Sequence, residues 1–302
     1  MSGAVFMFKF LVFLFLCLQI LQPEKAVAGT KEGLLLWYNA VLPAQLPFVM
    51  GVQVLMKSFG FHKISPILIN FILGMIAGYP MGSMTTAQLY RNGRVSKKNL
   101  TALAAFSNMA GPLFVLGTIG VILLENIYYG YLLLVVQWTS AVLLSVRVIF
   151  KERTMQFRNK EIAAELTKQS LSKQDSKNEI LEKHKIGNLL GDAMGETAQL
   201  MLKIAGFIVL FSVLKQWVGG AGGALMEMSS GIRWIVEQNI GIRWKLVGCS
   251  FLINFSGFCV ILQSLGVMEG SPVSALEFMG RKLLQGFLAA GIMLVICQFL
   301  NL

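Results

Sequence analysis

The chain has 302 residues, of which 55% are hydrophobic and 14% are charged, and its formal net charge is +11. A soluble domain carries about 25% charged residues, so this composition excludes an ordinary soluble protein. The positive charge does not indicate nucleic-acid binding, because most of it lies in short segments that flank apolar stretches, as orientation in a membrane requires.

Apolar stretches long enough to cross a membrane recur along the chain. A bilayer core about 30 Å thick needs about 20 apolar residues per helix. The sequence therefore predicts an all-α, polytopic integral membrane protein that is surrounded by the lipid bilayer. The stretches lie at 5–22, 33–56, 99–124, 128–149, 197–217 and 283–301.

Two segments are expected to lie outside the repeated part of the protein. Residues 1–32 are predicted to form an N-terminal transmembrane helix, and "AVA" at 26–28 leaves a cleaved signal peptide as the alternative. Residues 151–187 are predicted to form a charged cytoplasmic linker, because the stretch has many charges of both signs and no apolar run of span length. The basic segment "RNGRVSKK" at 91–98 marks a second cytoplasmic connection.

Residues 33–150 are predicted to form a first repeat with a re-entrant hairpin at 64–90. This run has no charged residue, lies between predicted cytoplasmic segments and is interrupted by Gly78, Tyr79 and Pro80. Arms of about 15 and 10 residues would reach only about 22 and 15 Å at 1.5 Å per residue, too short to cross the core. The interruption would be the tip of the hairpin. One long helix kinked at Pro80 is the alternative.

The next span, 99–124, is broken near its middle by Ser107, Asn108, Gly111 and Pro112. Proline cannot donate a backbone hydrogen bond, so the carbonyl of Asn108, four residues earlier, is left free. The freed carbonyls and the Asn108 amide predict a polar spot at mid-depth. An ordinary proline kink between packed helices is the alternative.

Residues 188–302 are predicted to repeat this order with inverted topology, related to the first half by a shift of 177 positions. A span at 197–217 precedes a charge-free run, 246–268, which is interrupted by "NFSGF" at 254–258 and expected to form a second re-entrant hairpin. A long helix, 272–301, ends the chain. Inverted repeats in transporters place the substrate site at the repeat interface near the midplane, where the two hairpin tips would meet.

Several segments resemble the YlbJ/SpoVV sporulation integral membrane proteins. The resemblance rests on "LPAQLPF" (42–48), "GMIAGYPMGS" (74–83), "NGRVS" (92–96), "FSNMAGPLF" (106–114), "NFSGFCVILQ" (254–263) and "GRKLLQG" (280–286). It implies membership of the wider nucleoside-recognition Gate group, similar in plan to concentrative nucleoside transporters. It also implies a place in the cell membrane or outer forespore membrane, and passage of dipicolinate into the forespore intermembrane space.

Three cationic residues in or near spans could match an anionic substrate: Lys203, Arg281 and Lys282. Charge inside a membrane is costly, so a function is the default hypothesis. Lys203 lies near a cytoplasmic helix end and could reach the interface instead. Arg281 is preferred because a guanidinium binds a carboxylate with two hydrogen bonds, although Glu277, four residues earlier, offers an ion pair as the alternative.

Together these patterns predict a membrane transporter or facilitator of a small anionic metabolite, most simply dipicolinate. A nucleoside carrier and a non-transporting morphogenesis protein that recruits partners through the linker are the alternatives. No enzymatic activity, metal or cofactor is expected, since no catalytic cluster lies within the spans, and a second copy of the chain or other sporulation membrane proteins are candidate partners. The predicted substrate-binding residues are Gly78, Tyr79, Pro80, Gly82, Ser83, Ser107, Asn108, Gly111, Pro112, Asn254, Ser256, Gly257, Gln263, Arg281 and Lys282.

Overall fold

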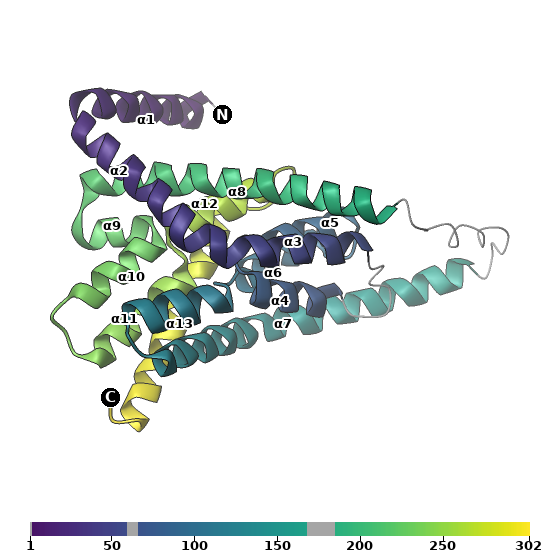
Figure 1. Ribbon diagram of the computed structural model, residues 1–302. Helices are drawn as coiled ribbons and strands as arrows, with labels where there is room; N and C mark the ends of the chain where they lie inside the picture. The colour runs from purple at the N-terminus through teal and green to yellow at the C-terminus, as the bar shows by residue number, and fades with distance from the viewer. Residues whose placement is uncertain (1, 59–65, 168–184) are drawn as a thin grey trace.

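The computed structural model describes residues 2–58, 66–167 and 185–302, and all regular elements in these ranges are helical (Figure 1). The expectation of an all-α polytopic membrane protein is confirmed. Five helices are long and apolar enough to cross a membrane: Pro23–Leu55, Ile127–Val146, Gly187–Val218, Ile242–Val267 and Ala275–Phe299.

The N-terminal part forms two helices of different direction. Helix α1 (Ser2–Leu21) turns at its end into α2 (Pro23–Leu36), which continues through the π-helical segment η1 (Trp37–Val41) into α3 (Leu42–Ser58) (Figure 1). The predicted boundary after residue 32 therefore lies inside a helix. This long helix packs along α8, and Gly29 allows the contact, because a Cβ there would lie 2.7 Å from a backbone atom of α8.

The first predicted hairpin is present as a folded-back pair of helices, α4 (Pro66–Ala77) and α5 (Met81–Arg91). The two helices lie side by side, and Asn70 Nδ2 on α4 donates a hydrogen bond to Thr86 Oγ1 on α5 at 2.9 Å. Gly78 has φ of +79°, a conformation that glycine adopts at little cost, and it turns the chain between the two helices. Residues 64 and 65 of the predicted hairpin lie outside the described residues, and entry of both arms from one side of a bilayer remains a prediction.

The broken span follows as α6 (Lys97–Ser107) and the π-helical segment η2 (Phe114–Leu123), and α7 (Ile127–Thr167) comes next. Helix α6 packs closely on the hairpin. A Cβ on Gly82 would lie 2.1 Å from the Ser107 carbonyl oxygen, so a larger residue cannot occupy this position without moving the helices apart.

The second half returns from the linker end of the molecule, which we define as the end where α7 stops and α8 begins (Figure 1). Part of the predicted linker, residues 168–184, lies outside the described residues. Six helices form this half: α8 (Lys185–Val218), α9 (Gly220–Met226), α10 (Met228–Glu237), α11 (Ile242–Phe255), α12 (Gly257–Val267) and α13 (Ala275–Phe299).

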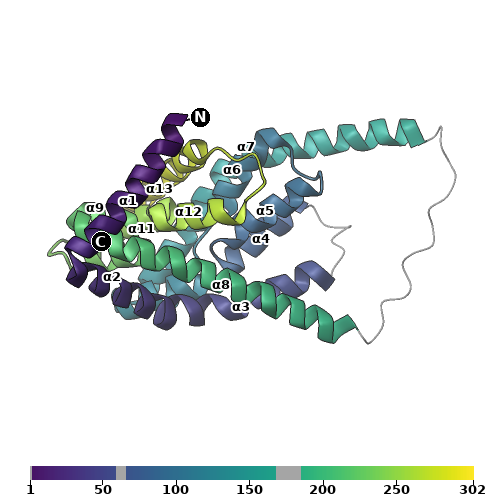
Figure 2. The same ribbon diagram turned by 90° about the horizontal axis from the view of Figure 1, so that it is seen from above.

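The second hairpin is formed by a different segment from the one predicted. Helices α9 and α10 pack against each other, whereas α11 and α12, within the predicted hairpin 246–268, follow one another in series (Figures 1 and 2). Their junction at Ser256, with φ of +77°, breaks the helix without reversing it. In sequence, residues 220–237 are typical of a glycine-rich turn followed by an amphipathic stretch, and they do not indicate a hairpin.

A spacing of Asn and Gly that occurs in both broken spans shows how the two halves correspond. Asn108 and Gly111 in the first broken span correspond to Asn254 and Gly257 in the second, and both pairs are 146 positions apart. The hairpin α4–α5 then corresponds to α9–α10, and α7 to α13. The predicted shift of 177 positions is therefore wrong, because it pairs the hairpin α4–α5 with the broken span α11–α12.

The arrangement of α11 and α12 also sets the direction of the last helix. Because α11 and α12 together run toward the linker end, α13 runs back, and the C-terminus lies at the opposite end from the linker (Figures 1 and 2). The connection before α13 lies near the first hairpin, where the Arg91 guanidinium donates to the Glu269 carbonyl at 2.6 Å.

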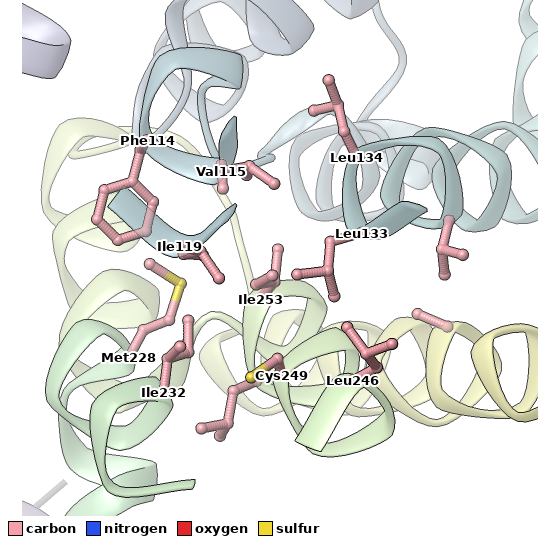
Figure 3. Packing of buried hydrophobic residues seen from close by; sticks show 14 of the residues in the cluster. Phe114, Val115, Ile119, Leu133, Leu134, Met228, Ile232, Leu246, Cys249 and Ile253 are labelled. Atoms are coloured by element: carbon pink, nitrogen blue, oxygen red, sulfur yellow. The ribbon is translucent and has the colours of Figure 1, made fainter. Parts of the chain in front are cut away.

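An apolar core joins the two halves. Side chains of η2 and α7, including Phe114 and Leu133, meet side chains of α10 and α11, including Met228, Ile232 and Ile253 (Figure 3). Each half thus buries apolar surface against the other, and this packing fixes the position of the second hairpin relative to the first half.

The corrected topology predicts the side from which two positions react. In a variant without native cysteines, Glu269→Cys should be labelled by an impermeant maleimide from the same side as Asn188→Cys near the start of α8. Leu300→Cys should be labelled from the other side. Labelling of Leu300→Cys from the same side as Asn188→Cys would contradict this direction of α13.

The close contact at Gly82 predicts a loss of stability on enlargement. Gly82→Ala should lower the free energy of unfolding by about 1–3 kcal/mol, as overpacking does. Gly291→Ala is the matched control, since no atom lies within 4 Å of its added Cβ. Thermal unfolding in detergent measures both, and equal melting temperatures would contradict the packing account.

Candidate functional site

Each hairpin tip packs against the break in the broken span of its own half. A Cβ on Gly78 would lie 2.6 Å from the backbone nitrogen of Gly111, and a Cβ on Gly257 would lie 3.1 Å from the backbone nitrogen of Met228. Non-helical backbone is therefore concentrated at one place between the halves. In a membrane such backbone must be buried in protein or line a cavity.

Tyr79 connects the first tip to the second half. Its hydroxyl donates to the carbonyl of Ile253, and it lies 3.6 Å from the sulfur of Met228 on the second hairpin. Ile253 is in the last turn of α11, where carbonyls have no partner within the helix. The tyrosine thus satisfies a carbonyl that the break leaves free, and it brings the first tip into contact with the tip of the α9–α10 hairpin.

Lys282 satisfies a carbonyl of the first break. Its Nζ atom donates to the Asn108 carbonyl at 2.9 Å and to Gln285 Oε1 at 3.0 Å. The side chain is fully buried, and no carboxylate among the described residues forms an ion pair with it. A buried ammonium held only by neutral oxygens is costly, which makes it a candidate functional group.

Amide side chains link the two breaks into one network. Gln285 Nε2 donates to Asn254 Oδ1 at 3.2 Å, and Ser140 Oγ donates to the same oxygen at 3.1 Å. Asn108 Nδ2 donates to Ser264 Oγ at 2.7 Å. The two corresponding asparagines are therefore joined by hydrogen bonds through Lys282 and Gln285.

Gln137 satisfies the backbone inside the first break. Its Oε1 atom accepts from the Ala110 amide at 3.2 Å, and its Nε2 atom donates to the Ala110 carbonyl at 2.9 Å. Together with the Lys282 contact, this side chain keeps the broken backbone hydrogen-bonded without water.

The tips and breaks surround a small central cavity of about 20 Å³. Larger cavities lie on either side. A cavity of about 260 Å³ shares the wall residues Ile204 and Gln263 with the central cavity. This second cavity also shares wall residues with a cavity of about 520 Å³ at the linker end. One of about 330 Å³ shares Ser229 with the central cavity and includes Arg233 near the opposite end. The central cavity is therefore narrower than the spaces on either side of it, and it shares wall residues with two of them.

Arg281, the preferred cation, lies apart from this network. Its guanidinium donates to the Glu277 carboxylate at 2.7 and 3.0 Å and lies 5.9 Å from the centre of the Phe106 ring. The side chain is 32% exposed, whereas Lys282 is fully buried. The geometry matches the alternative of a local ion pair. Lys203 is exposed and lines the linker-end cavity.

The other predicted residues have different positions. Tyr79, Gly111 and Gln263 line the central cavity, and Gln263 Nε2 donates to Cys259 Sγ at 3.1 Å. Ser83 and Ser107 have hydroxyls that donate to α6 carbonyls. Backbone positions complete the tips and breaks: Gly78, Pro80, Gly82, Pro112, Ser256 and Gly257.

Sequence reasoning missed an acidic residue of the second tip. Glu227 is 3% exposed, lines the central cavity and begins α10. It is a lone acid in the apolar and small-residue stretch "GGAGGALMEMSS", and a charge in such a stretch of a membrane protein could have identified it. Gln45, Gln137 and Gln285 were missed because each is a single amide on a long helix.

Comparison with known proteins points to one relative. The chain is 28% identical over 325 residues to the sporulation integral membrane protein YlbJ of Bacillus subtilis (strain 168), covering 92% of this chain and 79% of that protein. No protein-family model matches the chain, and no solved structure matches it. The protein is integral to the membrane, as its apolar helices and this relative agree. The chain is therefore similar to this sporulation integral membrane protein along nearly its whole length.

Proposed function

We propose that this protein acts in the membrane during sporulation as a carrier of a small anion, with dipicolinate as its substrate. The sporulation role is supported by the name of the Bacillus subtilis relative. The carrier role is supported by the central constriction. Wider cavities lie on both of its sides, and the constriction is formed by hairpin tips and broken helices, the elements that form midplane sites in transporters.

The choice of an anion is supported by Lys282. An ammonium has three hydrogens, and two of them are bonded to Asn108 and Gln285, while the third has no partner among the described residues. Asn108 is also bonded to Ser264, which is adjacent in sequence to the cavity residue Gln263. A shift at the first break would bring a substrate carboxylate within reach of Lys282 Nζ.

A nucleoside carrier is the second candidate, and Glu227 favours it. A carboxylate and the amides of Gln45 and Gln263 face the central cavity. Such groups accept and donate hydrogen bonds to hydroxyls and base edges without needing a substrate charge. The two candidates therefore differ in which residue contacts the substrate.

Uptake into proteoliposomes separates the candidates. Purified protein should accumulate or equilibrate labelled dipicolinate faster than protein-free liposomes, and should not do so with labelled uridine. Faster uptake of uridine alone would support the nucleoside carrier. Uptake of neither would contradict a carrier and favour the morphogenesis alternative.

Adjacent positions on α13 provide a matched pair of variants. Lys282→Met should reduce the initial uptake rate of dipicolinate at least tenfold at equal abundance, which corresponds to about 1.4 kcal/mol, because the fixed charge is lost. Arg281→Gln should retain most of the rate, since Arg281 pairs with Glu277. Normal uptake by well-expressed Lys282→Met would contradict the role of this charge.

A further inference from the structure

The second hairpin tip carries a buried negative charge without a cationic partner. The Glu227 carboxylate accepts from the backbone amides of Ser229 at 3.0 Å and Ser230 at 2.7 Å, one on each oxygen. The residue is 3% exposed, and no Lys or Arg in the described part of the chain forms an ion pair with it. The helix end offsets part of the charge, because the first amides of a helix are electropositive.

A second oxygen at the same cavity also lacks a partner. Gln45 lines the central cavity with Glu227, and its buried Oε1 atom accepts no hydrogen bond from any described residue. Gln263 adds a further amide to the wall. Gln45 lies on α3 and Glu227 on the second hairpin, so two separate elements bring oxygen acceptors to one space.

The size of the space limits what can occupy it. The cavity has a volume of about 20 Å³. A single water-sized sphere needs about 10–15 Å³, so the space accepts one water or one bare ion and excludes an organic molecule.

The chemistry of the wall indicates a small cation. A carboxylate has about four lone-pair sites, and the two amide bonds leave others free. Carboxylate and amide oxygens are ligands for hard cations. The single negative charge of Glu227 matches a monovalent ion. Among the described residues there is no group of three or more His, Cys, Asp or Glu that could hold a metal ion.

We propose that the central cavity binds one small monovalent cation, of the size of Na⁺, between the Glu227 carboxylate and Gln45 Oε1. The bound ion neutralises Glu227 at the narrowest point between the wider cavities. The ion's role in transport rests on the proposed function. There, a carboxylate that is not neutralised would repel a dianionic substrate, and the bound ion removes this repulsion. The binding itself requires no transport and can be measured alone.

Cation binding is tested on purified full-length protein in detergent without substrate. The melting temperature is measured in NaCl and in choline chloride at equal ionic strength. Na⁺ at 100 times its dissociation constant should raise the melting temperature by about 5 °C or more. The rise should disappear in Glu227→Gln and persist in Glu269→Gln, a matched change of an exposed acid at the linker-end cavity.

A second variant and a direct measurement guard against misfolding of Glu227→Gln. Gln45→Leu removes the other ligand and keeps the charge, and should weaken ²²Na⁺ binding at least tenfold. An equal melting temperature in both salts for the wild type, or an equal rise in Glu227→Gln, would overturn the site. Na⁺ binding without any dipicolinate uptake would overturn the proposed carrier and leave the site standing. Uptake that is equal in both salts would overturn the role of the ion in passage.

Discussion

Two helices of this protein are broken in its buried interior, and the backbone groups exposed there must be hydrogen-bonded without bulk water. An unsatisfied carbonyl or amide in hydrocarbon costs several kcal/mol, so each break requires a partner from another helix. Tyr79 supplies it to Ile253, Lys282 to Asn108 and Gln137 to Ala110. These three contacts place a hairpin tip, the last helix and α7 around the same centre. The central cavity and the polar network follow from the same requirement.

The class of fold and the first half could be predicted because their signals are local. Span-length apolar stretches identify membrane helices, and Gly78 to Pro80 mark a reversal that the structure contains between α4 and α5. The break at Asn108 and Gly111 was equally visible. The second hairpin was not, because its arms, 220–226 and 228–237, are too short to look like membrane elements. Only the repeated spacing of Asn and Gly in the two broken spans carried the correct correspondence.

The sequence identified the segments that form the site, but not which side chains in those segments face it. Arg281 and Lys282 are adjacent, but neighbours on a helix point about 100° apart, so one faces Glu277 and the other faces the break. Which of the two is buried depends on how α13 packs on α6 and α11, and sequence alone does not give that packing. Glu227 was hidden for a related reason. Its burial depends on the hairpin fold around it, and its amide partners Ser229 and Ser230 are ordinary residues at a helix start.

The central claim is that the two hairpin tips meet at a constriction and must separate for a substrate to pass. It is tested by joining them. In a variant without native cysteines, Tyr79→Cys and Met228→Cys, whose native side chains lie 3.6 Å apart, should be joined by a short, reducible, thiol-specific cross-linker. The account predicts that cross-linking stops dipicolinate uptake, that a reducing agent restores it, and that the cross-linker does not change the uptake rate of either single variant. Full uptake by completely cross-linked protein would contradict the account.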